Sequence, residues 1–245
     1  MRLLNEIHSS SILFLDIETV PMVPSFDQLS PSFRELWDKK SKYFRKEEED
    51  ASDVFDRAGI YAEFGKIICI SVGFIAGRED QMSLRLKSFY GHDEKKLLDE
   101  FSVMLNSFCL NRDIVLCAHN GKEFDYPYMA RRMIVNRMEI PAILDNAGKK
   151  PWEIKLLDTM ELWKFGDYKN FTSLELLAGL MGVPTPKDDI DGSMVAQIYY
   201  VENDIERIAR YCEKDVIALT QVFLKFRHND AIPPGRIESV SGFGS

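Results

Sequence analysis

The stretch ILFLDIET at residues 12–19 joins a run of apolar residues to two carboxylates at alternate positions. Side chains two apart on a strand share a face, so this pattern predicts a buried strand on which Asp16 and Glu18 project together while Ile17 points to the other side. Two close carboxylates repel one another, and burying either without a partner is costly. A hard divalent cation with oxygen ligands would compensate both. The pair alone also fits a strand end whose acids face water or cap the next element.

Length and composition indicate one large domain. The chain has 245 residues, of which 45% are hydrophobic, enough for a sizeable core. Its four cysteines lie far apart, mostly in apolar runs and without C-x-x-C spacing, which indicates buried, reduced thiols. The sequence lacks a run of eighteen apolar residues and a basic start followed by a long apolar segment. We therefore expect a cytoplasmic protein with no membrane contact.

The formal net charge of −8 argues against a broadly basic surface that coats nucleic acid. A nucleic-acid enzyme remains open, because bound metal would cancel the charge of several acids. Short basic segments for local substrate contacts occur at Arg131-Arg132 with Arg137, and at Lys149-Lys150.

A charged excursion separates the first two predicted strands. Pro31 suits a helix start, the residues from Ser32 to about Asp50 have helical composition, and a second short helix is expected at residues 52–58. The pattern predicts a helical insertion at about residues 22–64 that lies over the domain. A solvated face is the simpler interpretation of its charges, and a lid over a substrate is the alternative.

Further strands are predicted at residues 66–74, 82–90 and 114–118. The first is β-branched and apolar, the second alternates apolar and polar residues, and Gly77 marks the turn that joins them as a hairpin. The third strand leads into the stretch HNGKEFDYP at residues 119–127.

A carboxylate at such a strand-to-helix junction lies where pockets form, so Asp125 is a candidate site residue. Asn120 can orient water or hold a sugar or phosphate oxygen. The alternative is that Asp125 caps the helix and Asn120 makes the turn, a preference that both residue types have. His119 is interpreted as a polar residue that closes the strand.

Residues 138–154 form a predicted loop, and residues 156–159 a short strand or helix start. Asp158 fits either a supporting acid or a helix cap, and we favour the cap. The acidic stretch at residues 188–191 lacks the ligand spacing of a calcium loop, so a solvated turn is expected.

Aromatic and basic residues interleave between Leu162 and Phe171. This pattern suits stacking on unpaired bases with phosphate contacts nearby, although aromatics at this density more often form core. The residues are Trp163, Phe165, Tyr168 and Phe171, with Lys164 and Lys169.

A long helix is predicted from about Asn203 to Phe226, and it carries Tyr211 and Asp215. Positions i and i+4 share a helix face, so the phenol and the carboxylate point the same way. That face also carries Ile208 and Leu219, which indicates that both polar groups face inward and need a partner. A surface Asp beside a Tyr at the core edge is the alternative.

The predicted domain covers residues 1–228. The remaining residues, 229–245, contain Pro233-Pro234-Gly235 and end in Ser and Gly. Their composition predicts a loose C-terminal tail.

Taken together, the acids resemble those of the DEDD 3′-to-5′ exonuclease superfamily, in its tyrosine subclass. Acids come from a first strand, a middle junction and a last helix, in the order and on the elements that the superfamily uses. The histidine subclass would need His five residues before the last acid, where this chain has Arg210. The chain is similar to the proofreading exonuclease domain of family-B DNA polymerases, in a stand-alone bacterial form, over about residues 11–227. The motifs are Asp16-Ile17-Glu18-Thr19, Asn120-x-x-x-Phe124-Asp125-x-Pro127 and Tyr211-x-x-x-Asp215.

This resemblance implies a ribonuclease-H-like α/β fold, with a central mixed five-stranded sheet flanked by helices. It also implies two Mg²⁺ or Mn²⁺ ions. Asp16 would bridge both ions, and Glu18 and Asp215 would complete the first site. Asp125 would hold the second ion through water, and Tyr211 would position the attacking water. Physical chemistry agrees, because two ions about 4 Å apart can activate water and stabilise a leaving oxygen, and carboxylates suit such hard ions.

The implied activity is hydrolysis from the 3′ end of single-stranded DNA to nucleoside 5′-monophosphates, in DNA repair or proofreading. Thr19, Asn120 and Phe124 are candidates for holding the terminal nucleotide. DNA is favoured over RNA only by the closeness to the polymerase domain, since contact with the 2′-hydroxyl depends on local geometry. The alternatives are an exoribonuclease and a nucleic-acid-binding module without catalysis, and the complete set of acids argues against the module. A polymerase or repair protein is a candidate partner in trans.

Overall fold

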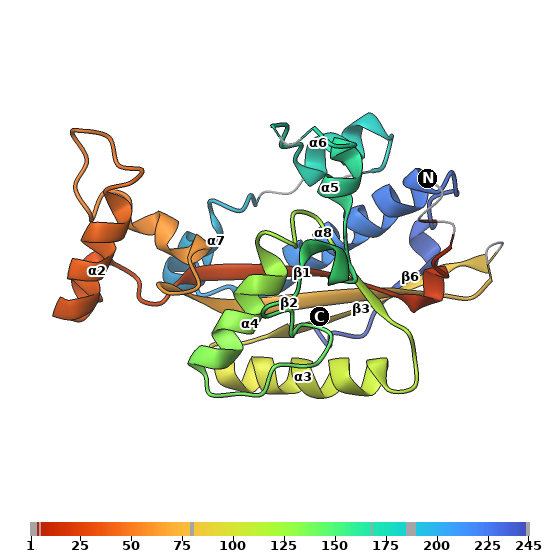
Figure 1. The fold of residues 1–245 in the computed structure, drawn as a ribbon, viewed down its shortest axis with the longest axis horizontal. Coiled ribbons are helices and arrows are strands. Elements are labelled where there is room, and N and C mark those ends of the chain that lie inside the picture. Colours follow the sequence, from red (N-terminus) through yellow and green to blue (C-terminus); the bar gives the residue numbers. More distant parts are fainter. Residues whose placement is uncertain (1–3, 5, 79–80, 168, 185–189, 244–245) are drawn as a thin grey trace.

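The computed structural model describes residues 4, 6–78, 81–167, 169–184 and 190–243, which form a mixed sheet with helices on both sides (Figure 1). The described residues give six strands in the order β5-β4-β1-β2-β3-β6. The α/β class is confirmed, with one strand more than expected. The strands are β1 (Ile12–Pro21), β2 (Gly65–Ala76), β3 (Ser83–Tyr90), β4 (Val115–Ala118), β5 (Leu156–Asp158) and β6 (Ile237–Ser239).

Helices fill the connections between these strands. The α-helices are α2 (Pro31–Ser41), α3 (Glu94–Cys109), α4 (Asp125–Val135), α5 (Thr159–Lys164), α6 (Leu174–Leu180), α7 (Val195–Gln197) and α8 (Ile205–Phe226). Short 3₁₀ segments are η1 (Ser9–Ser11), η2 (Phe26–Gln28), η3 (Phe55–Ile60), η5 (Pro151–Glu153) and η7 (Pro234–Arg236), and η6 (Ile198–Glu202) is a π-helix. Among the described helices, none combines the length and the apolar character needed to cross a membrane.

Strand β1 is central, parallel to β4 and antiparallel to β2. Its residues alternate between two cores, as the side-chain period of a strand requires. Leu13 and Ile17 lie in the core that includes α3 and α4, whereas Phe14 lies in the core that includes α8. The ring of Phe14 meets that of Phe223 edge to face, with centroids 5.3 Å apart. The next alternate positions after Phe14 are the two acids, so these face α8.

The insertion between β1 and β2 projects from one end of the sheet instead of lying over it (Figure 1). It has its own small core around Trp37, which is fully buried against residues such as Phe55 and Phe64. The helix α2 starts at Pro31 as predicted and is capped by Ser30, but it ends at Ser41 rather than near residue 50. The chain turns back there because the indole N–H of Trp37 donates to the carbonyl of Ala51, 2.8 Å away.

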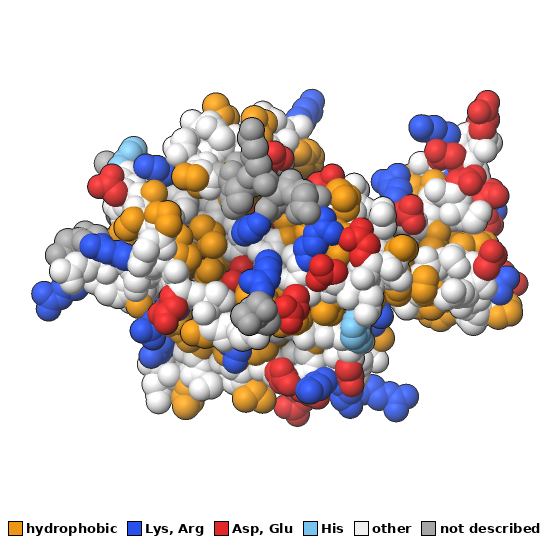
Figure 2. All heavy atoms as spheres, turned by 180° about the vertical axis from the view of Figure 1, so that it is seen from behind, with side chains coloured by type: hydrophobic (Ala, Val, Ile, Leu, Met, Phe, Trp, Pro, Cys, Tyr) orange, Lys and Arg blue, Asp and Glu red, His pale blue; other side chains and the backbone are white. Residues whose placement is uncertain are grey.

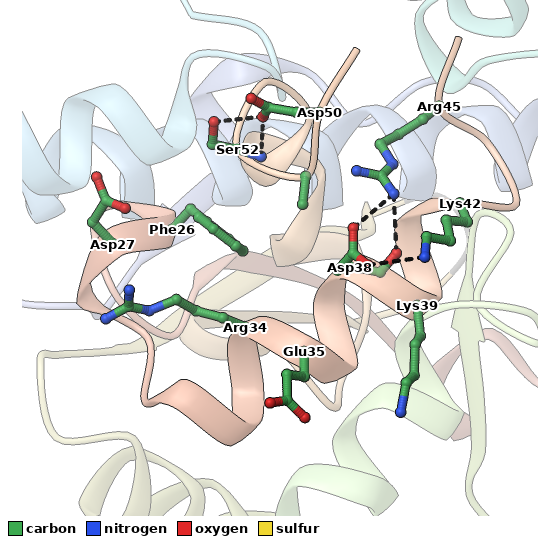
Figure 3. A pocket seen from close by; sticks show the side chains of 11 residues that line it. Phe26, Asp27, Arg34, Glu35, Asp38, Lys39, Lys42, Arg45, Asp50 and Ser52 are labelled. Atoms are coloured by element: carbon green, nitrogen blue, oxygen red, sulfur yellow. Dashed lines mark hydrogen bonds and ion pairs between the residues drawn. The ribbon is translucent and has the colours of Figure 1, made fainter. Parts of the chain in front are cut away.

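The predicted solvated face of the insertion is observed. Figure 3 shows a pocket on it whose lining is mostly charged. The carboxylate of Asp38 pairs with Lys42 at 3.1 Å and with Arg45 at 2.8 Å, and Asp50 accepts hydrogen bonds from Ser52. These charges therefore satisfy one another at the surface.

The predicted basic segment at Arg131-Arg132 is only partly available to a substrate. Arg132 is buried, and its guanidinium makes a bidentate pair with Glu94, at 2.6 and 2.8 Å. It also donates to the carbonyl of Ala62, while Glu94 accepts from the backbone N–H of Ile67. Arg132 is thus a structural residue that joins α3, α4 and the start of β2 to the base of the insertion.

The predicted loose tail is wrong for residues 237–239, which form β6. This strand pairs parallel to β3, with Leu84 opposite Ile237. The buried carboxylate of Glu213 on α8 accepts hydrogen bonds from the hydroxyls of Ser88, Ser239 and Ser241. A Pro-, Gly- and Ser-rich composition is typical of a tail, but these serines find a buried acceptor far away in sequence.

We predict that Glu213→Ala lowers the free energy of unfolding by about 2 kcal/mol, because three hydroxyl donors then lose a charged acceptor. Urea unfolding followed by circular dichroism measures this change. Glu213→Gln keeps an acceptor oxygen and should lose less. Unchanged stability in the alanine variant would show that the C-terminal strand is not held through this residue.

Candidate active site

Asp16 and Glu18 lie near the carboxyl end of β1, on the face that packs against α8. The carboxyl ends of β4 and β5, which run parallel to β1, lie at the same edge of the sheet. The pairing between β1 and β2 shifts register between Glu18 and Thr19. Such a bulge re-aims the following side chains, and bulges are frequent beside active sites.

Helix α8 places a thiol against these acids. The sulfur of Cys212 lies 3.3 Å from Oδ2 of Asp16 and 3.4 Å from its backbone oxygen. The sulfur and one carboxylate oxygen each from Asp16 and Glu18 all lie within 4.8 Å of one another. Sequence reasoning treated Cys212 only as a buried thiol, because nothing in the local pattern shows which carboxylate it meets.

The electrostatics bring the other two predicted acids into the same group. Burial raises the pKa of Asp16 well above its ordinary value, and the charges of Asp125, Asp215 and Glu18 raise it further. The pKa of Glu18 is likewise raised by burial and then by Asp215, with a smaller contribution from Asp125. The carboxylates of Asp125 on α4 and Asp215 on α8 therefore lie within electrostatic reach of the two acids of β1.

Asp125 is the first residue of α4 and is buried. Burial raises its pKa to about 7, and nearby Asp158 also raises it, whereas a hydrogen bond with the backbone of Ile17 lowers it. This bond ties Asp125 to the backbone of β1 between the two strand acids. The helix cap is Phe124, so Asp125 does not have the capping role that was its alternative.

Tyr211 and Asp215 point the same way from α8, as their spacing predicts. Their side chains are hydrogen-bonded to each other. Burial raises the pKa of the Tyr211 phenol, and the charges of Asp215, Glu18 and Asp16 raise it further. The phenol therefore lies within electrostatic reach of the strand acids.

Of the three candidates for holding a terminal nucleotide, Thr19 lies on β1 just after the bulge, and Asn120 and Phe124 lie on the turn between β4 and α4. Thr19 hydrogen-bonds to the hydroxyl of Tyr128, and the ring of Phe124 lies 5.3 Å from that of Tyr128. Asn120 has a left-handed backbone, with a φ of 62°. Its side-chain oxygen is buried and accepts no hydrogen bond from the described residues, which leaves a polar atom available for a ligand.

Asp158 has a larger role than the helix cap that we predicted. It caps α5 through the backbone N–H groups of Met160 and Glu161. It also accepts the backbone N–H groups of Asn120 and Lys122, at 2.9 and 3.0 Å. One side chain therefore shapes the loop that presents Asn120, a long-range contact that no local signal reveals.

His119 is held by structure rather than presented to a ligand. Its ring nitrogens lie 2.9 Å from the hydroxyl of Thr159 and 2.8 Å from the carbonyl of Thr172. Burial lowers its pKa, which favours the neutral ring. This agrees with its interpretation as a polar residue that closes a strand.

The donor set fits hard divalent cations. Several buried carboxylates that raise one another's pKa leave negative charge without enough compensation, and oxygen ligands of this kind suit Mg²⁺ or Mn²⁺. The thiol of Cys212 adds one softer donor at the edge of the group.

Comparison with known proteins agrees with this geometry. Residues 60–233 match a family described as predicted 3′-5′ exonucleases related to the exonuclease domain of PolB. The fold is similar to that of the family B DNA polymerase from the hyperthermophilic archaeon Pyrobaculum calidifontis, with a TM-score of 0.53 and 15% sequence identity. The match covers 88% of this chain but only 24% of the polymerase. No protein of curated function matches the chain.

The chain therefore belongs to the family of predicted 3′-5′ exonucleases related to the exonuclease domain of PolB. The fold similarity confirms the expected ribonuclease-H-like architecture. The family match contains Asp125, Tyr211 and Asp215, whereas Asp16 and Glu18 precede it.

The pKa of Asp125, about 7, predicts that the metal-free protein loses stability as pH rises. The same carboxyl group has a pKa of about 4 in the unfolded chain, so between about pH 4 and about pH 7 the folded protein binds more protons than the unfolded chain. The free energy of unfolding therefore decreases as the pH rises through this range. The raised pKa values of Asp16 and Glu18 act in the same direction. We expect the melting temperature in EDTA to fall from about pH 4 to about pH 7, and Mn²⁺ to restore it most at the higher pH.

Asp125→Asn is the matched control, because asparagine resembles the protonated acid and does not titrate. Its melting temperature in EDTA should fall less over the same pH range. A fall as steep as that of the wild-type protein would contradict the assignment.

Proposed function

We propose that this protein is a metal-dependent 3′-5′ exonuclease that removes nucleoside 5′-monophosphates from single-stranded DNA. The observation that carries the proposal is the meeting of Asp16, Glu18, Asp125 and Asp215 beside the phenol of Tyr211. Buried acids that raise one another's pKa are expected where cations bind during function.

In this proposal each acid has a distinct role. Asp16 would help to hold both cations, Glu18 and Asp215 would help to hold one of them, and Asp125 would help to hold the other. Bound divalent ions would supply an activated water on one side of the phosphodiester and stabilise the leaving 3′-oxygen on the other. The cysteine thiol beside Asp16 restrains the orientation of its carboxylate.

Tyr211 is proposed to orient the attacking water. Its raised pKa keeps the phenol protonated at neutral pH, so it does not act as a base, and because its one O–H donates to Asp215, its oxygen is left to accept a hydrogen bond from the water. The hydrogen bond to Asp215 holds the ring in place. Asn120 has a free buried acceptor on the neighbouring loop, which suits a contact with the terminal nucleotide.

DNA is the proposed substrate because the family is related to a DNA polymerase domain. The corresponding biological role is repair or proofreading, with a polymerase or repair protein as the partner. An exoribonuclease is the second candidate, since the same acids would cleave either backbone and only a contact at the 2′-hydroxyl distinguishes them.

We predict that the purified protein with Mg²⁺ or Mn²⁺ shortens 5′-labelled single-stranded oligonucleotides stepwise. Removing a residue that only hydrogen-bonds to a metal ligand typically lowers activity about 10- to 100-fold. Asp16 is proposed as a ligand itself, so Asp16→Ala should lower the rate of cleavage by more than about 100-fold. Gel electrophoresis of DNA and RNA oligonucleotides of one sequence, side by side, measures both the activity and the preference. If the folded wild-type protein binds the DNA and the RNA oligonucleotide but shortens neither, the result would favour a binding module without catalysis.

Tyr211→Phe should lower kcat by about 100-fold, because a positioned proton-transfer or water-orienting group contributes on this scale. The affinity for Mn²⁺, measured by isothermal titration calorimetry, should stay unchanged because the phenol is not assigned as a ligand. Loss of metal affinity in this variant would reject the assignment.

A further inference from the structure

The aromatic stretch between Leu162 and Phe171 divides into buried and exposed rings. Trp163 stacks on Phe226 of α8, with centroids 6.3 Å apart and ring planes 8° from parallel. The side chains of Phe165 and Phe171, in contrast, are 77% and 65% exposed. Tyr168 lies outside the described residues. Trp163 therefore belongs to the hydrophobic core. The two exposed phenylalanines do not, so their aromatic character needs a different explanation.

Basic side chains accompany the exposed rings. The ammonium of Lys164 lies 4.3 Å from the centroid of the Phe171 ring, and Lys169 is exposed. Exposed aromatic faces beside lysines are the combination that binds single-stranded nucleic acid, because bases stack on the rings while ammonium groups contact phosphates.

Hydrogen bonds place this stretch beside the candidate active site. Thr172 directly follows Phe171, and its carbonyl accepts from the ring of His119 at 2.8 Å. The next residue, Asn120, donates its backbone N–H to the carboxylate of Asp158. The charge of Asp158 in turn raises the pKa of Asp125. In Figure 1, α5 and α6 stand together above this end of the sheet. Seen from behind in Figure 2, the molecule is hollowed near its centre, with acidic and basic side chains around the hollow.

We propose that Phe165 and Phe171, together with Lys164 and Lys169, bind nucleotides upstream of the 3′ end that lies at the acids. This inference rests on the proposed function, because it takes the same single strand as the occupant. Phe165 is in the left-handed conformation that ends α5, with a φ of 45°, and it is exposed there. The two rings would hold a long strand while leaving the chemistry at its end untouched.

The first test compares a 16-nucleotide oligo(dT) with a dinucleotide. In EDTA, which prevents cleavage, fluorescence anisotropy should show that Phe165→Ala with Phe171→Ala weakens binding of the long strand about 10-fold or more, since stacking of each base contributes strongly. With Mn²⁺, kcat/KM should fall for the long strand but not for the dinucleotide. Tyr43→Ala is the matched control, because Tyr43 is an aromatic residue on the insertion that is 90% exposed.

The lysines give an independent readout. Replacing Lys164 and Lys169 by Gln should reduce the slope of log affinity against log salt by about 1.4, because each phosphate contact on a single strand contributes about 0.7. Circular dichroism and melting temperature should stay unchanged in all variants.

The outcomes separate the two proposals. If the wild-type protein cleaves both substrates and the variants keep the preference for the long strand, the proposed stacking surface is wrong and the exonuclease proposal stands. The exposed rings would then bind a protein partner. A wild-type protein that binds the long strand through these residues but cleaves nothing overturns the exonuclease and keeps the surface. A wild-type protein that neither binds nor cleaves oligonucleotides overturns both.

Discussion

Repulsion between buried carboxylates is the constraint on which the rest of this structure depends. Burial raises the pKa of Asp16 and of Glu18, the charges of Asp125 and Asp215 raise both further, and such a group stays folded only if the surrounding framework holds it. The framework supplies hydrogen bonds at close range. The backbone of Ile17 bonds to Asp125, and the thiol of Cys212 donates to Asp16. The carboxylates of Asp16 and Asp125 are thus restrained by the protein itself, which is what a pre-organised site requires.

Helix α8 carries Asp215 and Tyr211 and is held against the sheet by ordinary packing. Phe223 meets Phe14, and a Cβ at Gly73 would lie only 2.8 Å from Cγ1 of Val216, so the glycine permits the close approach of α8 to β2. Glu213 fastens the same helix to β3 and to the C-terminal strand through serine hydroxyls. Tyr211 and Asp215 thus project from a helix whose other faces are fixed.

The insertion and the α5–α6 region extend this core in different ways. The insertion has a core of its own around Trp37, and its surface charges pair with one another. Its base is joined to the domain through Arg132 and the buried Glu94. The α5–α6 region instead leaves two phenylalanines exposed beside lysines, near the loop that Asp158 shapes. Both regions expose aromatic side chains, but only those of the α5–α6 region lie near the loop that presents Asn120.

The sequence alone determined the strand with its two acids, the shared face of Tyr211 and Asp215 and the order of the motifs. Those features follow from the short periods of strands and helices, which local pattern expresses directly. The tertiary structure alone decided that Arg132 is buried, that Asp158 holds the Asn120 loop, that Cys212 touches Asp16 and that residues 237–239 form a strand. Each of these contacts depends on a partner far away in sequence. The local sequence around a residue does not show which distant residue it will contact in the folded chain.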